Sequence, residues 1–220
     1  MIAAAVFDMD GLLLDTERLF YDTFVTACNE QGWDGPWEVF LRSVGRAREN
    51  IVPMLRDEMG PDFPAETVVE RSYVLAEEML RNDGPPLKAG ATEALEAISA
   101  RGLRAVVATS TDTADARRYL EHTGLLHRFE AVVGGDQVER GKPEPDIFLA
   151  AARTLGVDPT SILVFEDSDL GVRAAAAAGM RVVMIPDLIE PTEELRRLAF
   201  AVVPSLEAAA RGLDVLVGTA

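Results

Sequence analysis

The sequence is poor in positive charge, in cysteine and in long apolar runs, and each shortage excludes a class of protein. Lysine and arginine number 21 against 37 aspartate and glutamate residues, a formal charge of −16, so the field of the whole protein repels nucleic acid and anionic membranes. The single cysteine, Cys28, cannot form an intrachain disulfide, as is usual in a reducing compartment. No segment approaches the ~18 apolar residues of a membrane span. We therefore expect a cytoplasmic protein that binds neither nucleic acid nor membranes.

Apolar residues make up 48% of the 220-residue chain, which is enough for a sizeable core. Short apolar runs are typical of buried strands, and segments of helical length separate most of them. The predicted strands are 3–7, 104–108, 131–133, 162–165, 182–185 and 201–203. The predicted helices between them are 92–100, 113–122, 147–155 and 170–178. Strands that alternate with helices predict an α/β fold with a Rossmann-like, doubly wound parallel sheet.

The segment 16–84 breaks this alternation. It carries helical patterns and no convincing strand, and the connection "NDGPPLKAG", rich in proline and glycine, ends it. We therefore predict two domains. Residues 1–15 and 85–220 form a catalytic core, and residues 16–84 form an all-helical domain inserted after the first strand.

Polar residues follow several of the predicted strands at the point where each strand ends. In open parallel sheets, ligands bind beyond the carboxyl ends of the strands, so these residues are expected to share one site. They are Asp8 and Asp10, then Thr109, Ser110 and Thr111, then Glu166 and Asp167. So many acids cannot all stay ionised side by side without a compensating cation. Oxygen ligands of this type suit Mg²⁺, which we predict as the cofactor.

The remaining parts of a phosphoryl-transfer site are also present. The transferring group carries charge on three oxygens, so it requires hydrogen-bond donors, a cation and an in-line nucleophile. Thr109 and the adjacent amides supply donors, and Lys142 supplies a point charge from a proline-rich loop. Aspartate can itself be the nucleophile, and Asp8 is the candidate because it directly follows the strand. Asp10, two residues further on, can then serve as acid and base.

Four short motifs resemble those of a known family in their order and spacing. "FDMDG", "ATS", "GKPEPD" and "FEDSDLGV" are similar to the four motifs of the haloacid dehalogenase superfamily, and the likeness covers essentially the whole chain. The helical insert resembles the small α-helical cap of one subfamily, which includes sugar phosphatases, nucleotide-type phosphatases and β-phosphoglucomutase. The resemblance implies that segment 16–84 is a cap that sets substrate specificity.

The resemblance also implies a role for each matching residue. Asp8 matches the nucleophile and a Mg²⁺ ligand, and Asp10 matches the general acid and base, whose backbone carbonyl also binds the metal. The implied phosphate-binding residues are Thr109, Ser110 and Lys142. The implied metal ligands are Asp8, Asp10, Glu166 and Asp167. Dehalogenase chemistry is not implied, because the dehalogenases lack the second aspartate of the first motif and this chain has Asp10.

Several residues of the predicted cap are candidate substrate contacts, each with an alternative. Thr16 contacts substrate or caps the first helix of the insert. Arg46 and Arg48 are two cations in an otherwise acidic protein, so one of them holds a second anionic group of the substrate or both lie on a solvated helix face. Arg71 is a weaker candidate for the same role. Phe20 stands where the mutase-like pattern of the family has a histidine.

These observations predict a Mg²⁺-dependent phosphatase that hydrolyses a small phosphorylated metabolite, a sugar or nucleoside phosphate, through an aspartyl-phosphate intermediate. The alternative is a phosphomutase of the β-phosphoglucomutase type, but the absence of a histidine at Phe20 favours hydrolysis. A non-catalytic binding derivative is a third hypothesis. The intact catalytic set argues against it, since a binding module does not need a nucleophile. We expect the protein to be a monomer.

Overall fold

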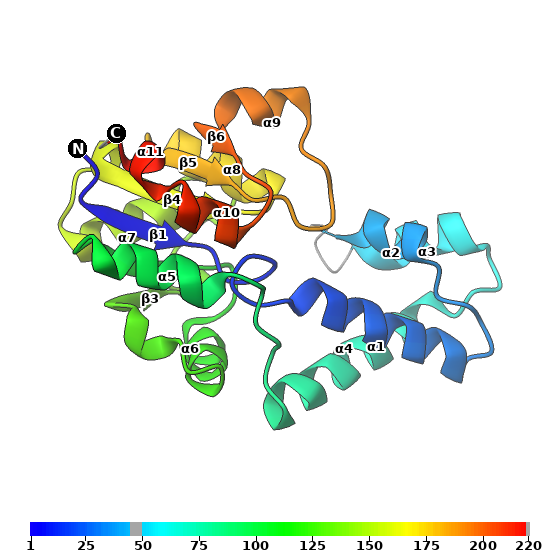
Figure 1. The fold of residues 1–220 in the computed structure, drawn as a ribbon. Helices are drawn as coiled ribbons and strands as arrows, with labels where there is room; N and C mark the ends of the chain where they lie inside the picture. The colour runs from blue at the N-terminus through cyan, green and yellow to red at the C-terminus, as the bar shows by residue number, and fades with distance from the viewer. Residues whose placement is uncertain (45–49, 219–220) are drawn as a thin grey trace. The chain divides into compact units, whose positions relative to one another are not determined.

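The computed structural model describes residues 1–44 and 50–218 and contains a six-stranded parallel sheet (Figure 1). The strands are β1 (Ala4–Phe7), β2 (Arg104–Ala108), β3 (Ala131–Val133), β4 (Ile162–Glu166), β5 (Arg181–Met184) and β6 (Ala201–Val202). They lie in the order β3-β2-β1-β4-β5-β6, and each neighbouring pair is parallel. The strand order changes direction between β1 and β4, and such a switch point is where open sheets bind their ligands.

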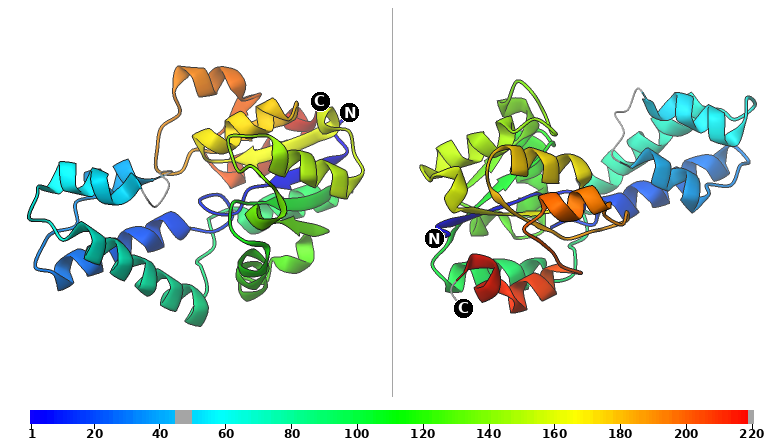
Figure 2. Two further views of the ribbon diagram at one scale, coloured as in Figure 1. Left: turned by 180° about the vertical axis from the view of Figure 1, so that it is seen from behind. Right: turned by 90° about the horizontal axis from the view of Figure 1, so that it is seen from above.

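Helices cover both faces of this sheet, as Figure 2 shows. One face carries α7 (Asp146–Leu155) and α8 (Asp169–Ala177), and the other carries α5 (Ala91–Ala100) and α10 (Leu206–Arg211). The other α-helices of the sheet-bearing part are α6 (Thr113–His122), α9 (Glu193–Leu198) and α11 (Leu213–Val217). Ile147 and Phe148 of α7 and Val172 of α8 are buried in one cluster with strand residues. Burial of these apolar faces provides the main drive to form the layered core.

The predicted α/β class and doubly wound parallel sheet are confirmed. The apolar runs correspond to the observed strands because a strand covered on both faces is apolar at nearly every position. β4 is one residue longer than predicted and includes Glu166, whose carbonyl accepts a bond from the Ile185 amide (2.7 Å). A polar residue inside a strand is not visible from hydrophobicity alone.

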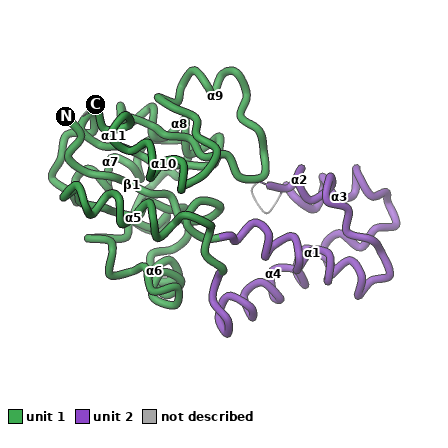
Figure 3. Tube along the Cα trace, viewed as in Figure 1, with its two compact units in different colours: residues 1–14, 86–220 green, residues 15–85 purple. Residues whose placement is uncertain are grey.

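The chain forms two compact units (Figure 3), which we describe separately. Unit 1 consists of Met1–Leu14 and Pro86–Ala220 and contains the sheet. Unit 2 is Asp15–Pro85. The helices described in unit 2 are α1 (Thr16–Glu30), α2 (Trp37–Ser43), α3 (Ile51–Met59) and α4 (Ala65–Asn82). Helix α1 packs against α4, where the hydroxyls of Thr23 and Ser72 form a buried hydrogen bond of 3.1 Å. No helix in the described ranges is both long enough and apolar enough to cross a membrane.

Candidate active site

Asp8 lies at the carboxyl edge of the sheet, directly after β1. Its backbone N–H continues the β1–β4 ladder by donating to the Phe165 carbonyl (3.0 Å), and only 5% of the residue is exposed. Beyond Asp8 the chain turns at once, and the Leu14 amide donates to the Met9 carbonyl (3.0 Å). Gly11 has a φ of +79°, which glycine adopts without steric cost. A strand on one side and a tight loop on the other therefore hold Asp8 in place.

Lys142 is buried between two carboxylates. Its Nζ donates to Asp8 Oδ1 and also to Glu166 Oε1, the latter at 2.6 Å. Glu166 Oε2 accepts bonds from the amide and the hydroxyl of Ser168 at 2.8 and 3.0 Å, so both oxygens of Glu166 are engaged. A Cβ at Gly171 would overlap Glu166 Oε1. Gly171 therefore leaves room for the Glu166 carboxylate, which is one of the two that bond the lysine.

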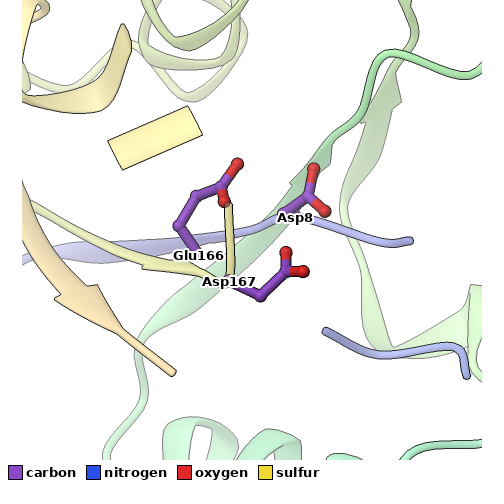
Figure 4. Close-up of side chains that lie close together, drawn as sticks. All are labelled: Asp8, Glu166 and Asp167. Carbon is purple, nitrogen blue, oxygen red and sulfur yellow. The ribbon is translucent and has the colours of Figure 1, made fainter. Parts of the chain in front are cut away.

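Asp8, Glu166 and Asp167 offer carboxylate oxygens that all lie within 4.8 Å of one another (Figure 4). Burial raises the pKa of Asp8 to about 8, and Lys142 opposes the rise while the charges of Glu166 and Asp10 add to it. Burial, followed by the charges of Glu166 and Asp8, holds the pKa of Asp167 well above its usual value. Burial by itself lowers the pKa of Lys142, but the charges of Asp8 and Glu166 raise it above its ordinary value. One lysine does not balance three carboxylates, so this cluster attracts a further cation.

Asp167 carries an oxygen that fits such a cation. Within the described residues, Oδ1 of Asp167 is buried and has no hydrogen-bond partner, although buried polar atoms are nearly always bonded. A Cβ at Gly11 would overlap Asp167 Oδ2, so the glycine also makes space for this side chain. An excess of buried negative charge and an unpaired carboxylate oxygen are the properties expected of a site for a hard divalent cation such as Mg²⁺. The residues present therefore fit the metal.

Two threonines at the end of β2 hold Asp10. Thr109 Oγ1 and Thr111 Oγ1 both donate to Asp10 Oδ2, at 3.2 and 2.7 Å, and the Thr111 amide donates to Thr109 Oγ1 (3.1 Å). Thr109 is fully buried, whereas Ser110 between them is exposed. Thr111 was predicted to lie at this strand end, but its bond to Asp10 was not predicted. The available signal was the Thr-Ser-Thr sequence directly after a strand, because hydroxyl side chains favour turns in which they bond the amide two residues further on.

Most of the predicted site residues of unit 1 lie close together, as their hydrogen bonds and the short distances between their carboxylates show. The residues linked in this way are Asp8, Asp10, Thr109, Lys142, Glu166 and Asp167. Ser110 follows the same strand end, but its side chain is exposed. We therefore assign the predicted phosphate contact of Ser110 to its backbone amide.

Two predictions for unit 2 fall on described residues near the start of α1. Thr16 is the buried first residue of α1, so the N-cap position falls on Asp15, whose side chain makes no capping hydrogen bond. The predicted capping by Thr16 is therefore wrong. Phe20 lines an apolar pocket within unit 2, together with Phe24, Phe40 and Tyr73. A substrate contact by Thr16 or Phe20 stays a prediction.

The predicted arginines of unit 2 have different outcomes. Arg71 forms two hydrogen bonds to the carboxylate of Glu30, at 2.7 and 2.9 Å. Nε and Nη2 of Arg71 are therefore engaged by a carboxylate of the same unit. Arg46 and Arg48 lie outside the described residues.

Comparison with known proteins identifies the family. A family model described as haloacid dehalogenase-like hydrolase matches residues 2–179. A phosphorylated carbohydrates phosphatase from Thermotoga maritima is 32% identical over 182 residues, which cover 80% of this chain and 82% of that protein. The fructose-1-phosphate phosphatase YqaB of Escherichia coli is 33% identical over 181 residues, which cover 82% of this chain and 95% of that protein.

A solved structure supports the same assignment. The crystal structure of a haloacid dehalogenase family hydrolase from Deinococcus radiodurans R1, with bound phosphate and sodium, matches with a TM-score of 0.82 at 26% identity. The match covers 98% of this chain and 97% of that one. Because the family model spans most of the chain, this protein belongs to the haloacid dehalogenase-like hydrolase family.

Proposed function

We propose that this protein is a Mg²⁺-dependent phosphatase that hydrolyses a small phosphorylated sugar or nucleoside metabolite through an aspartyl-phosphate on Asp8. The observation that carries the proposal is the buried group formed by Asp8, Lys142 and Asp167. It combines a carboxylate nucleophile, a fixed cation and an unpaired carboxylate oxygen at one strand edge. The phosphorylated carbohydrate and fructose 1-phosphate phosphatases among the relatives support the substrate class.

Asp8 carries out the first step. One of its carboxylate oxygens forms a bond to phosphorus while the bond from phosphorus to the ester oxygen breaks. Lys142 neutralises charge on the phosphoryl oxygens. The amide of Ser110 provides a hydrogen-bond donor, and so does the hydroxyl of Thr109 once it turns from Asp10 to the phosphoryl group. Asp10, protonated at this stage, gives its proton to the departing oxygen, so the product leaves as an alcohol.

Asp10 then acts as the base of the second step. It removes a proton from a water molecule whose oxygen forms a bond to phosphorus. The bond between phosphorus and Asp8 breaks, which releases inorganic phosphate and restores the Asp8 carboxylate. The proton that Asp10 takes from water replaces the one that left with the alcohol, so the cycle balances.

The carboxylates next to Asp8 divide into a ligand and a positioning group. When bound, Mg²⁺ supplies charge neutralisation for the phosphoryl group and the carboxylates. Asp8 and Asp167 are the proposed side-chain ligands, with the carbonyl of Asp10 as a backbone ligand. Glu166 is less suited to direct ligation because Lys142 and Ser168 already bond both of its oxygens. We assign to Glu166 the positioning of Lys142.

Hydrolysis is favoured over phosphoryl transfer to a second sugar hydroxyl. The mutase-like pattern of the family has a histidine where this chain has Phe20, and an apolar ring cannot donate a hydrogen bond to a group near the acid. We also propose that the inserted segment 16–84 acts as the specificity cap. Its aromatic pocket, which includes Phe20, is the feature of this segment best suited to contact an apolar face of a substrate.

The test is metal-dependent phosphate release by the purified protein. We expect hydrolysis of p-nitrophenyl phosphate and of members of a sugar and nucleoside phosphate panel in Mg²⁺, none in excess chelator, and inhibition by Ca²⁺, which takes more ligands at longer distances. Full activity in chelator would overturn the metal dependence. Conversion of β-glucose 1-phosphate to glucose 6-phosphate, primed by a bisphosphate and faster than phosphate release, would establish the mutase instead.

A further inference from the structure

Asp187 is a buried carboxylate that the proposed reaction does not use. It lies three residues beyond β5, and its side chain is only 8% exposed. β5 pairs with β4 so that Met184 lies beside Glu166, and the Ile185 amide donates to the Glu166 carbonyl (2.7 Å). The chain therefore carries Asp187 past the carboxyl end of the strand next to the one that leads to Asp167.

The two oxygens of Asp187 have different surroundings. Oδ1 accepts a bond from Lys88 Nζ, and the backbone amide of Lys88 donates to the Leu13 carbonyl (2.9 Å) in the loop after Asp8. Oδ2 is buried and has no hydrogen-bond partner in the described part of the chain. One oxygen of the carboxylate is thus bonded to Lys88, and the other has no donor among the described residues.

A second buried carboxylate oxygen within the described ranges also lacks a hydrogen-bond partner. Within residues 1–44 and 50–218, the buried side-chain polar atoms that lack a partner are Oδ2 of Asp187 and Oδ1 of Asp167. After burial and the charges of Glu166 and Asp8, the charge of Asp187 is among the causes that raise the pKa of Asp167, so the two carboxylates lie close enough to interact. Two unpaired acceptors at one strand edge indicate a shared missing group.

A hydrated cation satisfies both oxygens at once. Mg²⁺ binds one or two carboxylates directly and usually keeps several of its waters. Those waters are strong donors that need acceptors around the metal, and such outer partners orient the site and tune its affinity. Asp167, in the cluster with Asp8, is placed for direct contact. Asp187 belongs to the neighbouring strand end, and no carboxylate cluster within ligand distance includes it among the described residues.

We propose that Asp187 is a positioning residue for the divalent cation, whose Oδ2 accepts a hydrogen bond from a water bound to the metal that Asp167 ligates. This inference rests on the metal dependence of the proposed function. Lys88 fixes the carboxylate through Oδ1 and leaves Oδ2 to the water.

The competing explanation is that Asp187 and Lys88 form a purely structural ion pair. Substituting each of the two residues separately distinguishes this explanation from the proposal. If Asp187 only pairs with Lys88, then Asp187→Asn and Lys88→Gln remove the same interaction and should change the protein alike. If Asp187 also accepts from a metal-bound water, Asp187→Asn removes the charged acceptor and Lys88→Gln leaves it in place. Only the first variant should then bind Mg²⁺ more weakly.

The experiment is a calorimetric titration of MgCl₂ into the metal-free full chain without substrate, at one fixed pH. For Asp187→Asn we expect the dissociation constant to rise by about 10- to 100-fold, the usual effect of losing an outer partner of a metal site. Asp214→Asn is the matched control, because it removes an equal charge from an exposed pair with Arg101. Lys88→Gln and Asp214→Asn should stay near wild type.

A double variant guards against a failure of folding. Lys88→Met with Asp187→Leu removes both charges together, so no buried charge is left unpaired, and it should still bind Mg²⁺ about 10- to 100-fold more weakly. Wild-type affinity in Asp187→Asn or in the double variant, or equal weakening in Lys88→Gln, would overturn the inference alone. Absence of Mg²⁺ binding by the wild-type protein would overturn the metal dependence of the proposed function and this inference with it.

Discussion

Thr111 donates a hydrogen bond from its hydroxyl to Oδ2 of Asp10 over 2.7 Å. Thr109 donates to the same oxygen at 3.2 Å. The two threonines therefore restrain the Asp10 carboxylate, and neither of them bonds Oδ1 of Asp10. A side chain that first gives and then takes a proton needs both properties. It must be held in position, and one oxygen must remain open to the reacting groups.

Thr111→Val should therefore lower the rate without preventing folding. The change keeps the branched shape but removes the donor to Asp10. A hydrogen bond to a charged group is worth about 1.5–3 kcal/mol, so we expect kcat to fall by about 10- to 100-fold. Steady-state kinetics with p-nitrophenyl phosphate measure the effect. Thr111→Ser keeps the hydroxyl and should retain most activity, and an equal loss in both variants would assign the effect to packing.

The sheet and the strand-end residues could be predicted because both depend on local sequence. Most positions of each strand are apolar, and Asp8 and Thr109 each follow an apolar run directly. Parallel pairing then brings these strand ends to one edge, whatever the details of packing. The resemblance of the four motifs to a known family then predicted roles, such as metal ligation by Asp167, that the residue types alone left open.

The bonds among these residues could not be predicted, because they join segments far apart in the chain. Lys142 bonds Asp8 across 134 positions and Glu166 across 24, and no pattern in the sequence shows that one lysine serves both. The pairing of Arg71 with Glu30, 41 positions away, was hidden for the same reason. Side-chain partners of this kind depend on tertiary packing, which periodicity and motif spacing do not encode.

Asp8→Asn should abolish turnover. The amide keeps the size of the side chain but is not a nucleophile, and it loses the charge that pairs with Lys142. We expect a fall in kcat of at least about a thousandfold, as when a covalent nucleophile is removed from an enzyme. Single-turnover assays at saturating Mg²⁺ would measure it, with Asp214→Asn as the control for charge. A variant that kept a few per cent of wild-type activity would exclude the covalent route through Asp8.

Gly171→Ala should damage the site through Glu166. A Cβ at this position would overlap Glu166 Oε1, which accepts the bond from Lys142. The carboxylate has to move, so we expect a loss of activity of about tenfold or more and a destabilisation of about 1–3 kcal/mol, typical of overpacking. Denaturant unfolding and steady-state kinetics measure the two effects.

Gly141→Ala is the matched control for that change. Apart from its two chain neighbours, no atom of residues 1–44 and 50–218 lies within 4 Å of a Cβ built at Gly141, and its φ is not positive, so a methyl group there meets open space. It should leave stability within about 0.5 kcal/mol of wild type. If the two alanine variants behaved alike, close packing around Glu166 would not be the cause.

The metal-free protein should become less stable as the pH rises from 6 to 8. The pKa of Asp8 is about 8 in the folded protein, against 3.8 for an aspartate carboxyl in water, the value expected of the unfolded chain. Between these values the folded protein binds a proton that the unfolded chain has lost, so the free energy of unfolding falls with pH. The contribution is complete below the lower pKa and is lost as the pH passes the higher one. Lys142 stays charged throughout because its pKa is raised.

Thermal unfolding in excess chelator measures this dependence, and each such group contributes up to about 1.4 kcal/mol per pH unit. Mg²⁺ should reverse the trend, because a cation binds the ionised carboxylates and releases their protons, so that its stabilising effect grows with pH. Asp8→Asn removes one of the two carboxyls whose pKa is raised and leaves Asp167, so it should make the metal-free curve less steep. A melting temperature that holds constant or rises between pH 6 and 8 in chelator, or an unchanged slope in Asp8→Asn, would show that burial does not hold a proton on Asp8.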